Sequence, residues 1–237
     1  MAEDIAPALL DKVNKNFHGR LEKAGATKAA MLKRARDGTV DSLYQYSNKV
    51  GKALSRAFVD EIVPEELPNG ILYYNIAEKV MVPPIKEAYK MVSDVADQVQ
   101  TVKNTKAGIN LKAVRPPLED ERVKGIIDRV TNGLFADNVH YLVEPVRNLV
   151  DHFADHHMEK NAEFLANTGL EITITRIASV NACEWCEDRA GIYHNYDEAL
   201  GNEAFARHEG CRCEVNISNG YTSGKMRASG RGFVRTQ

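Results

Sequence analysis

Five side chains near the C-terminus are of the types that bind a transition metal. Cys183 and Cys186 have C-x-x-C spacing, and His208 lies shortly before Cys211, which forms a C-x-C pair with Cys213. A C-x-x-C turn lets two thiolates converge on one ion, and C-x-C spacing on a strand points both side chains to the same face. The chain has no other cysteine. The two stretches offer five donors for the four places of a tetrahedral metal site.

The chemistry of these donors favours zinc in a structural role. Soft sulfur ligands with one imidazole suit zinc better than calcium or magnesium, and four protein ligands leave no open position for water. The segment between the two stretches has few apolar residues, and the only tryptophan, Trp185, is expected to pack against the site. Closing this loop around an ion would contribute several kcal/mol to folding.

Two other uses of the cysteines remain open from the spacing alone. The thiols can pack as small apolar side chains, or they can serve disulfide or redox chemistry. A thioredoxin-like role is disfavoured, because the acids Glu184, Glu187 and Asp188 would raise the pKa of a neighbouring thiol rather than lower it.

A catalytic zinc site is the main functional alternative. In that interpretation the Cys/His cluster and one of these acids form the centre of a hydrolase or a deaminase. A zinc deaminase needs a His-x-Glu pair on one helix and C-x-x-C on another. Here His208 directly precedes Glu209, so the deaminase spacing fails. We therefore expect a protein that is not an enzyme.

Charge and hydropathy exclude several classes of protein. The 237 residues carry a formal net charge of -2, which argues against a globally basic nucleic-acid-binding protein. No run of about 18 or more apolar residues occurs, so no membrane span is expected. The chain begins without a secretory pattern, so we expect it to fold in a reducing cytoplasm. Clustered cysteines in that compartment are more often metal ligands than disulfides.

The C-terminal residues, 219–237, form a basic tail without periodicity. It carries Lys225, Arg227, Arg231 and Arg235 and no acidic residue. Such a segment could bind DNA phosphates nonspecifically. A solvated tail without a partner is the alternative, because four charges are a modest density.

Apolar spacing predicts that the first two thirds of the chain are helical. The first helix, ending near Gly25, has an apolar residue at every fourth position: Ile5, Leu9, Val13, Phe17 and Leu21. A second helix is predicted over Val40–Ile62. A third pattern runs from Ile76 to Val99, and we expect a kink or break where Pro83-Pro84 interrupts it.

The period of the pattern changes towards the C-terminus. Residues 101–118 are polar and contain a Pro-Pro pair, which predicts an exposed linker. A long helix is predicted over Asn138–Asn167, bent at Pro145 and capped by Gly169. Beyond it, β-branched residues over 171–179 and alternation over 211–217 predict two strands that could pair with each other.

These elements define a mainly α fold. A multi-helix N-terminal body (1–118) is followed by a long joining helix (119–170). A small α+β Cys/His module of zinc-ribbon type (171–218) and the basic flexible tail (219–237) complete the chain.

The order of residues in the C-terminal part resembles that of a known family. It reads Arg176, then Cys183-x-Trp185-Cys186, then Ala190-Gly191-x-Tyr193, then Arg207-His208-x-x-Cys211-x-Cys213, after a helix ending in Ala-Asn-Thr-Gly-Leu. This order is similar to that in the minor head proteins of tailed bacteriophages, a group also called head-morphogenesis or Mu F-like proteins. The resemblance covers residues from about 140 to 217 and does not extend into the helical N-terminal half.

The resemblance implies a structural component of the virion. Such a protein would be present in multiple copies in the capsid interior or at the portal vertex, after assembly in the host cytoplasm. It would contact the portal protein, the major capsid protein, or both, in head assembly and DNA packaging, and its basic tail could contact packaged DNA. The five Cys and His residues would form the family's cluster, and Trp185, Gly191 and Tyr193 would shape its loop.

Overall fold

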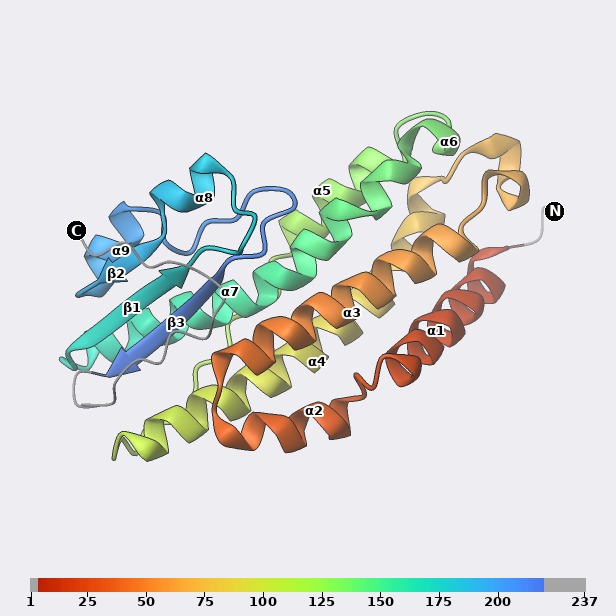
Figure 1. Ribbon diagram of the computed structural model, residues 1–237. Coiled ribbons are helices and arrows are strands. Elements are labelled where there is room, and N and C mark those ends of the chain that lie inside the picture. Colours follow the sequence, from red (N-terminus) through yellow and green to blue (C-terminus); the bar gives the residue numbers. More distant parts are fainter. Residues whose placement is uncertain (1–3, 220–237) are drawn as a thin grey trace. The chain divides into compact units, whose positions relative to one another are not determined.

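The computed structural model describes residues 4–219, and it is mostly helical with a small sheet near the C-terminus (Figure 1). The helices are α1 (Ala6–Lys23), α2 (Lys28–Arg34), α3 (Val40–Glu61), α4 (Tyr74–Lys106), α5 (Asp120–Val130), α6 (Phe135–Asn138), α7 (Glu144–Asn167), α8 (Glu184–Asp188) and α9 (Tyr196–Gly201). The strands are β1 (Ile172–Ile177), β2 (Gly191–Tyr193) and β3 (Glu214–Asn219). Short 3₁₀ turns cover Ala35–Asp37, Pro64–Glu66, Pro68–Gly70 and Val139–Leu142. The predicted fold class is confirmed.

The chain forms two compact units, each assembled from separate segments. Unit 1 consists of the residues up to Met31, Gln45–Val92 and Pro117–Phe153. Unit 2 consists of Leu32–Tyr44, Ser93–Pro116 and the residues from Ala154 on. Helices α2, α3, α4 and α7 each contribute residues to both units. Unit 2 contains all the cysteines and the sheet.

Unit 1 is a set of helices packed through the apolar stripes that the sequence predicts. The α1 residues Val13 and Phe17 are fully buried, which confirms the first helix. On α3, Gly51 lets the backbone of α7 approach closely, because a Cβ there would lie 3.3 Å from the Cα of Arg147. A buried hydrogen bond from Ser47 Oγ to Asp151 Oδ1, 2.9 Å long, joins the same two helices.

The sequence predicts a kink or a break at Pro83 and Pro84, and helix α4 runs through both prolines without a break. Each proline removes one backbone hydrogen bond from the helix. Their neighbours Val80, Met81 and Ile85 are fully buried, so tertiary packing holds the helix together at this point.

The predicted exposed linker over 101–118 is wrong in its first part, since α4 continues to Lys106. After it, the backbone of Val114 is held by the side chain of Asn161 on α7. Val114 N–H donates to Asn161 Oδ1, and Asn161 Nδ2 donates to the Val114 carbonyl, both at 2.8 Å. This segment is therefore packed against α7 within unit 2 and is not an arm.

Helix α7 begins later than predicted. It starts at Glu144, after a 3₁₀ turn over Val139–Leu142, so Pro145 lies in its first turn and does not bend it. A proline is tolerated there because first-turn N–H groups have no partner within the helix. The predicted cap at Gly169 is confirmed by its φ of +79° and by a hydrogen bond from Leu170 N–H to the Leu165 carbonyl.

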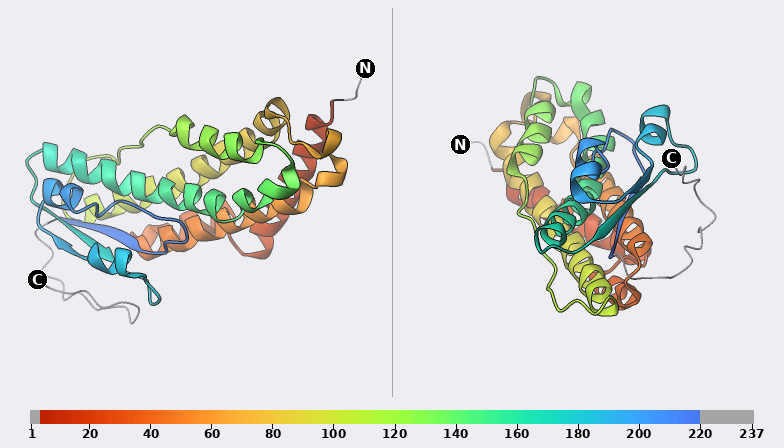
Figure 2. Two further views of the ribbon diagram at one scale, coloured as in Figure 1. Left: turned by 90° about the horizontal axis from the view of Figure 1, so that it is seen from above. Right: turned by 90° about the vertical axis from the view of Figure 1, so that its left-hand side faces the viewer.

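The sheet has the order β2-β1-β3, with both pairs antiparallel. The pairing of β1 with β3 confirms the sequence prediction, with Ile174 opposite Ile217 and Arg176 opposite Val215. Strand β2 was not predicted, and it places Gly191 opposite Arg176. In Figures 1 and 2 the sheet lies beside the C-terminal half of α7, with α8 and α9 on the connection that leads from β1 to β3.

Among residues 4–219, no helix combines the length and the apolar character that crossing a bilayer requires. The tail residues Lys225, Arg227, Arg231 and Arg235 lie outside the described part of the chain.

Candidate metal centre

The first cysteine pair lies at the start of α8. Cys183 is the residue before the helix, and its carbonyl accepts hydrogen bonds from the N–H groups of Cys186, at 2.9 Å, and Glu187, at 3.0 Å. This turn places both thiols on the side of α8 that faces His208. Cys183 is exposed and Cys186 is buried, so the pair spans the edge of the module.

The second stretch turns back towards the first. Cys211 N–H donates to the His208 carbonyl at 3.2 Å, and Gly210 has a φ of +76°, a conformation that favours glycine. Cys211 and Cys213 are buried immediately before β3, and not within the strand as predicted. The tight turn directs His208 and the following thiols to the same region.

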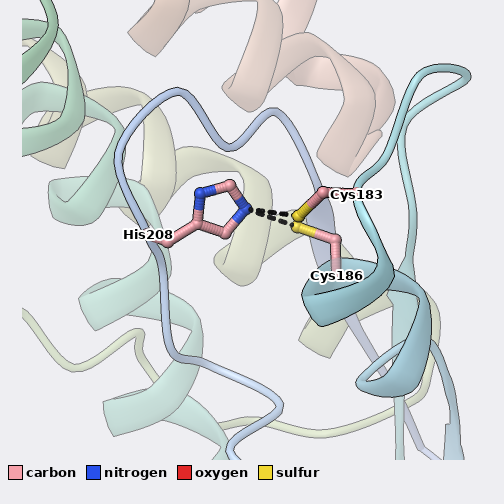
Figure 3. Close-up of side chains that lie close together, drawn as sticks. All are labelled: Cys183, Cys186 and His208. Carbon is pink, nitrogen blue, oxygen red and sulfur yellow. Dashed lines mark hydrogen bonds between the residues drawn. The ribbon is translucent and has the colours of Figure 1, made fainter.

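Distances between the donor atoms show that the predicted cluster forms. His208 Nε2 lies 3.3 Å from Cys183 Sγ and 3.0 Å from Cys186 Sγ, and Figure 3 shows the imidazole pointing between the two sulfurs. Cys186 Sγ lies 3.5 Å from Cys211 Sγ. Ligands of a tetrahedral zinc ion are separated by about 3.5–3.8 Å, given its bond lengths of about 2.0–2.3 Å. The observed separations are all shorter than these values, by about 0.2 to 0.6 Å, so a bound ion would need the donors to move apart slightly.

The five donors form two groups of three that share Cys186. In the outer group Cys183, Cys186 and His208 offer donor atoms within 4.8 Å of one another. In the inner group Cys186, Cys211 and Cys213 do the same, and all three are buried. Cys186 is therefore the donor that the two groups have in common.

His208 is oriented as a metal ligand. Its Nδ1 lies 2.6 Å from the Glu209 carbonyl oxygen, which can only accept a hydrogen bond, so Nδ1 carries the proton. In this tautomer Nε2 carries a lone pair, and it faces the two thiols. A histidine that binds a metal through one nitrogen commonly donates from the other in this way.

The environment without a metal keeps two of the thiols protonated. Burial raises the pKa of Cys186 to about 11. The hydrogen bond with Cys213, together with burial, raises the pKa of Cys211 further, and the same hydrogen bond lowers that of Cys213. A cation that binds to thiolates would therefore have to displace protons from the buried sulfurs.

Arg176 supplies positive charge next to the inner group. Its side chain is fully buried on β1, and Nη1 donates to the carbonyls of Ala204 and Ala206, each at 2.7 Å. Nη2 lies 3.7 Å from Cys211 Sγ. The guanidinium thus holds the segment before His208 and can offset the negative charge of a thiolate site.

Trp185 packs against the cluster, as predicted. Its ring meets the edge of the His208 imidazole at 5.0 Å between centroids, with an angle of 85° between the rings. The Arg189 guanidinium lies 3.9 Å from the centroid of the indole and forms an ion pair with Glu203. The indole therefore limits the access of water to one side of His208.

The other two residues that were predicted to shape the loop, Gly191 and Tyr193, both lie on β2. Tyr193 OH donates to the Arg189 carbonyl at 2.8 Å and so helps fix the end of α8. At Gly191 a Cβ would only make ordinary contacts with the Tyr193 ring, at 3.9 Å, so no steric requirement for glycine is found there.

Sequence reasoning did not predict the partner of Arg207. Its guanidinium pairs with Asp155 on α7, which lies 52 residues away in the chain. The sequence around Asp155 gives no local signal of such a pair, and the position of Arg207 before His208 is the only hint.

No family model, curated protein or solved structure matches this chain. The structure itself shows that Cys and His side chains from two separate stretches lie close enough together to bind a metal ion.

Proposed function

We propose that this chain is a structural protein of a phage head, a minor capsid protein whose C-terminal module is held together by a zinc ion. The observation that carries the proposal is the convergence of Cys183, Cys186, His208 and the Cys211/Cys213 pair. These are the residues that the resemblance to minor head proteins assigns to one cluster. The motif order and the three-dimensional convergence therefore support the same interpretation.

The donor set supports zinc over other metals. Three thiolates and one imidazole are soft or borderline ligands, and the separations are close to those of tetrahedral coordination. The outer group, Cys183, Cys186 and His208, would provide three ligands, and the inner group would provide the fourth. Bound zinc would supply a cross-link between α8 and the segment that precedes β3, without chemistry of its own.

The site favours a structural role over a catalytic one. Five donors are available for four positions, so a water ligand is not needed to complete the coordination. Cys186, Cys211 and Cys213 are also buried, which leaves little access for a substrate.

In the virion the protein would act in several copies at the portal vertex or on the inner face of the capsid. The portal protein and the major capsid protein are the proposed partners in head assembly. The basic residues Lys225, Arg227, Arg231 and Arg235 would contact packaged DNA nonspecifically, where the high local concentration of DNA compensates for weak binding.

Metal analysis of the purified chain tests the zinc site. We expect about one zinc per chain in the wild type and its loss in His208→Gln. The matched control is His194→Gln, because His194 is an exposed histidine outside the cluster. Metal-free wild-type protein, or equal zinc content in both variants, would contradict the proposal. Zinc-dependent hydrolysis or deamination of small substrates would favour the enzyme instead.

Incorporation into heads tests the virion role. The chain would be produced together with the portal and major capsid proteins of the phage that encodes it, and the particles would be separated by sedimentation. We expect the chain to sediment with the heads, and His208→Gln to be incorporated less well than His194→Gln. A chain that stays entirely in the unassembled fraction would contradict a role in the head.

A further inference from the structure

Arg207 forms a buried ion pair with the long helix α7. Its Nε donates to Asp155 Oδ2 at 2.6 Å and its Nη2 donates to Asp155 Oδ1 at 3.0 Å. The exposed fractions of the two side chains are only 5% and 3%. A two-point pair of this kind fixes orientation as well as distance, because the guanidinium is planar.

The same guanidinium also holds the C-x-C segment. Nη1 donates to the Cys211 carbonyl at 2.7 Å, and Nη2 donates to the Cys213 carbonyl at 3.1 Å. These carbonyls belong to the two residues whose thiols complete the inner donor group. Arg207 also directly precedes His208 in the chain, so one residue connects α7 with His208 of the outer group and with the C-x-C segment of the inner group.

Asp155 is itself held in place from α3. Tyr44 OH donates to Asp155 Oδ1 at 2.8 Å. Burial raises the pKa of Tyr44 well above its usual value, so the hydroxyl keeps its proton and remains a donor. The carboxylate thus has little freedom to rotate away from Arg207.

We infer that Arg207, oriented by Asp155 and Tyr44, is a positioning residue for the metal centre. It fixes the backbone of Cys211 and Cys213 so that their thiols face Cys186 before an ion binds. The inference rests on the proposed zinc site and adds residues outside the set of ligands. Partners that orient metal ligands in this way commonly change metal affinity by about 10- to 100-fold.

Zinc affinity of the full chain, measured by competition with a chromophoric chelator, tests the inference. Arg207→Lys keeps the charge but loses the planar fork, so it cannot satisfy Asp155 and both carbonyls at once. We expect its zinc affinity to fall by about 10- to 100-fold. Arg115→Lys is the matched control, because Arg115 binds Asp94 and Asp97 within the same unit and belongs to no part of the cluster. We expect its zinc affinity to equal that of the wild type.

A milder variant keeps the test valid if Arg207→Lys does not fold. Tyr44→Phe removes only the hydroxyl that orients Asp155, and we expect zinc affinity to fall by about two- to tenfold. The zinc affinity of the Arg207→Lys/Tyr44→Phe double variant should fall by less than the product of the two single fold-changes, because both substitutions act through the carboxylate of Asp155.

A role in overall stability alone predicts a different result. The melting temperatures of the metal-free and zinc-loaded variants would then fall by the same amount, and zinc affinity would not change. Wild-type affinity in folded Arg207→Lys and Tyr44→Phe would therefore overturn the inference and leave the zinc site standing. A wild-type chain without zinc affinity would overturn both.

Discussion

His157 on α7 links the stability of unit 2 to pH. Its side chain is fully buried, and neither ring nitrogen has a hydrogen-bond partner within residues 4–219. The nearest acid, Asp97, places Oδ1 3.6 Å from Nδ1. Burial lowers the pKa of His157 from 6.5 to about 3, and the positive charges of Arg115 and His156 act in the same direction.

The sign of the effect follows from proton binding. The unfolded chain takes up a proton on His157 as the pH falls through 6.5, whereas the folded chain does so only near 3. Between these values the unfolded state binds more protons, so the free energy of unfolding falls as the pH falls. The slope from one group is about 1.4 kcal/mol per pH unit, so the loss reaches roughly 3 kcal/mol at a pH of about 4.5.

The substitution His157→Leu isolates this contribution. Leucine removes the titrating group and two buried nitrogens without partners, so we expect stability near neutral pH to change by about 1 kcal/mol or less. Urea unfolding of the metal-free chain at about pH 7 and about pH 4.5 measures the difference. The variant should lose roughly 3 kcal/mol less than the wild type over this interval. An acid-induced loss equal to that of the wild type would show that His157 does not titrate in this way, and His194→Gln serves as the exposed control.

Further predictions concern the fourth ligand and two glycines. Cys211 Sγ accepts a hydrogen bond from Cys213 N–H, as metal thiolates often do, which favours Cys211 as the fourth ligand. Cys211→Ser should therefore abolish zinc binding, whereas Cys213→Ser should retain about one zinc per chain. The reverse pattern of zinc content would contradict this choice. Gly38→Ala should lower the free energy of unfolding by about 1–3 kcal/mol, because φ is +68° and a Cβ would lie 2.7 Å from Val102 Cγ1. Gly19→Ala should raise it by up to about 1 kcal/mol, because Gly19 lies within α1 and no atom is within 4 Å of its Cβ position. Urea titrations of the two glycine variants should therefore shift in opposite directions.

Periodicity was sufficient to predict the elements whose pattern is repeated over several turns. Phe17 and Leu21 continue a stripe that one face of a helix must bury, and α1 follows it. The pairing of β1 with β3 was predictable in the same way, because Ile174 and Ile217 both belong to alternating stretches. The cluster was predictable because C-x-x-C and C-x-C spacings each direct two thiols to the same side of the chain.

The remaining features depend on contacts between residues distant in sequence. Pro83 and Pro84 predict a break locally, and only the packing of their buried neighbours keeps α4 continuous. Strand β2 is too short to have a recognisable period. The pair formed by Asp155 and Arg207 joins a polar helix face to a loop, and no pattern in either segment indicates the other.

The composition of unit 2 limits how its metal centre could be transplanted. A fragment starting at β1 would contain the five donors and all three strands but would lack Tyr44, Lys103 and Asp155. Lys103 donates to the Ile217 carbonyl and, at 2.5 Å, to Asn216 Oδ1 on β3. Asp155 pairs with Arg207, and Tyr44 holds Asp155. We therefore expect that the Cys/His segment, unlike an independent zinc finger, would not fold as a portable domain, and that fusing it to another protein would leave the proposed site in an unsupported loop.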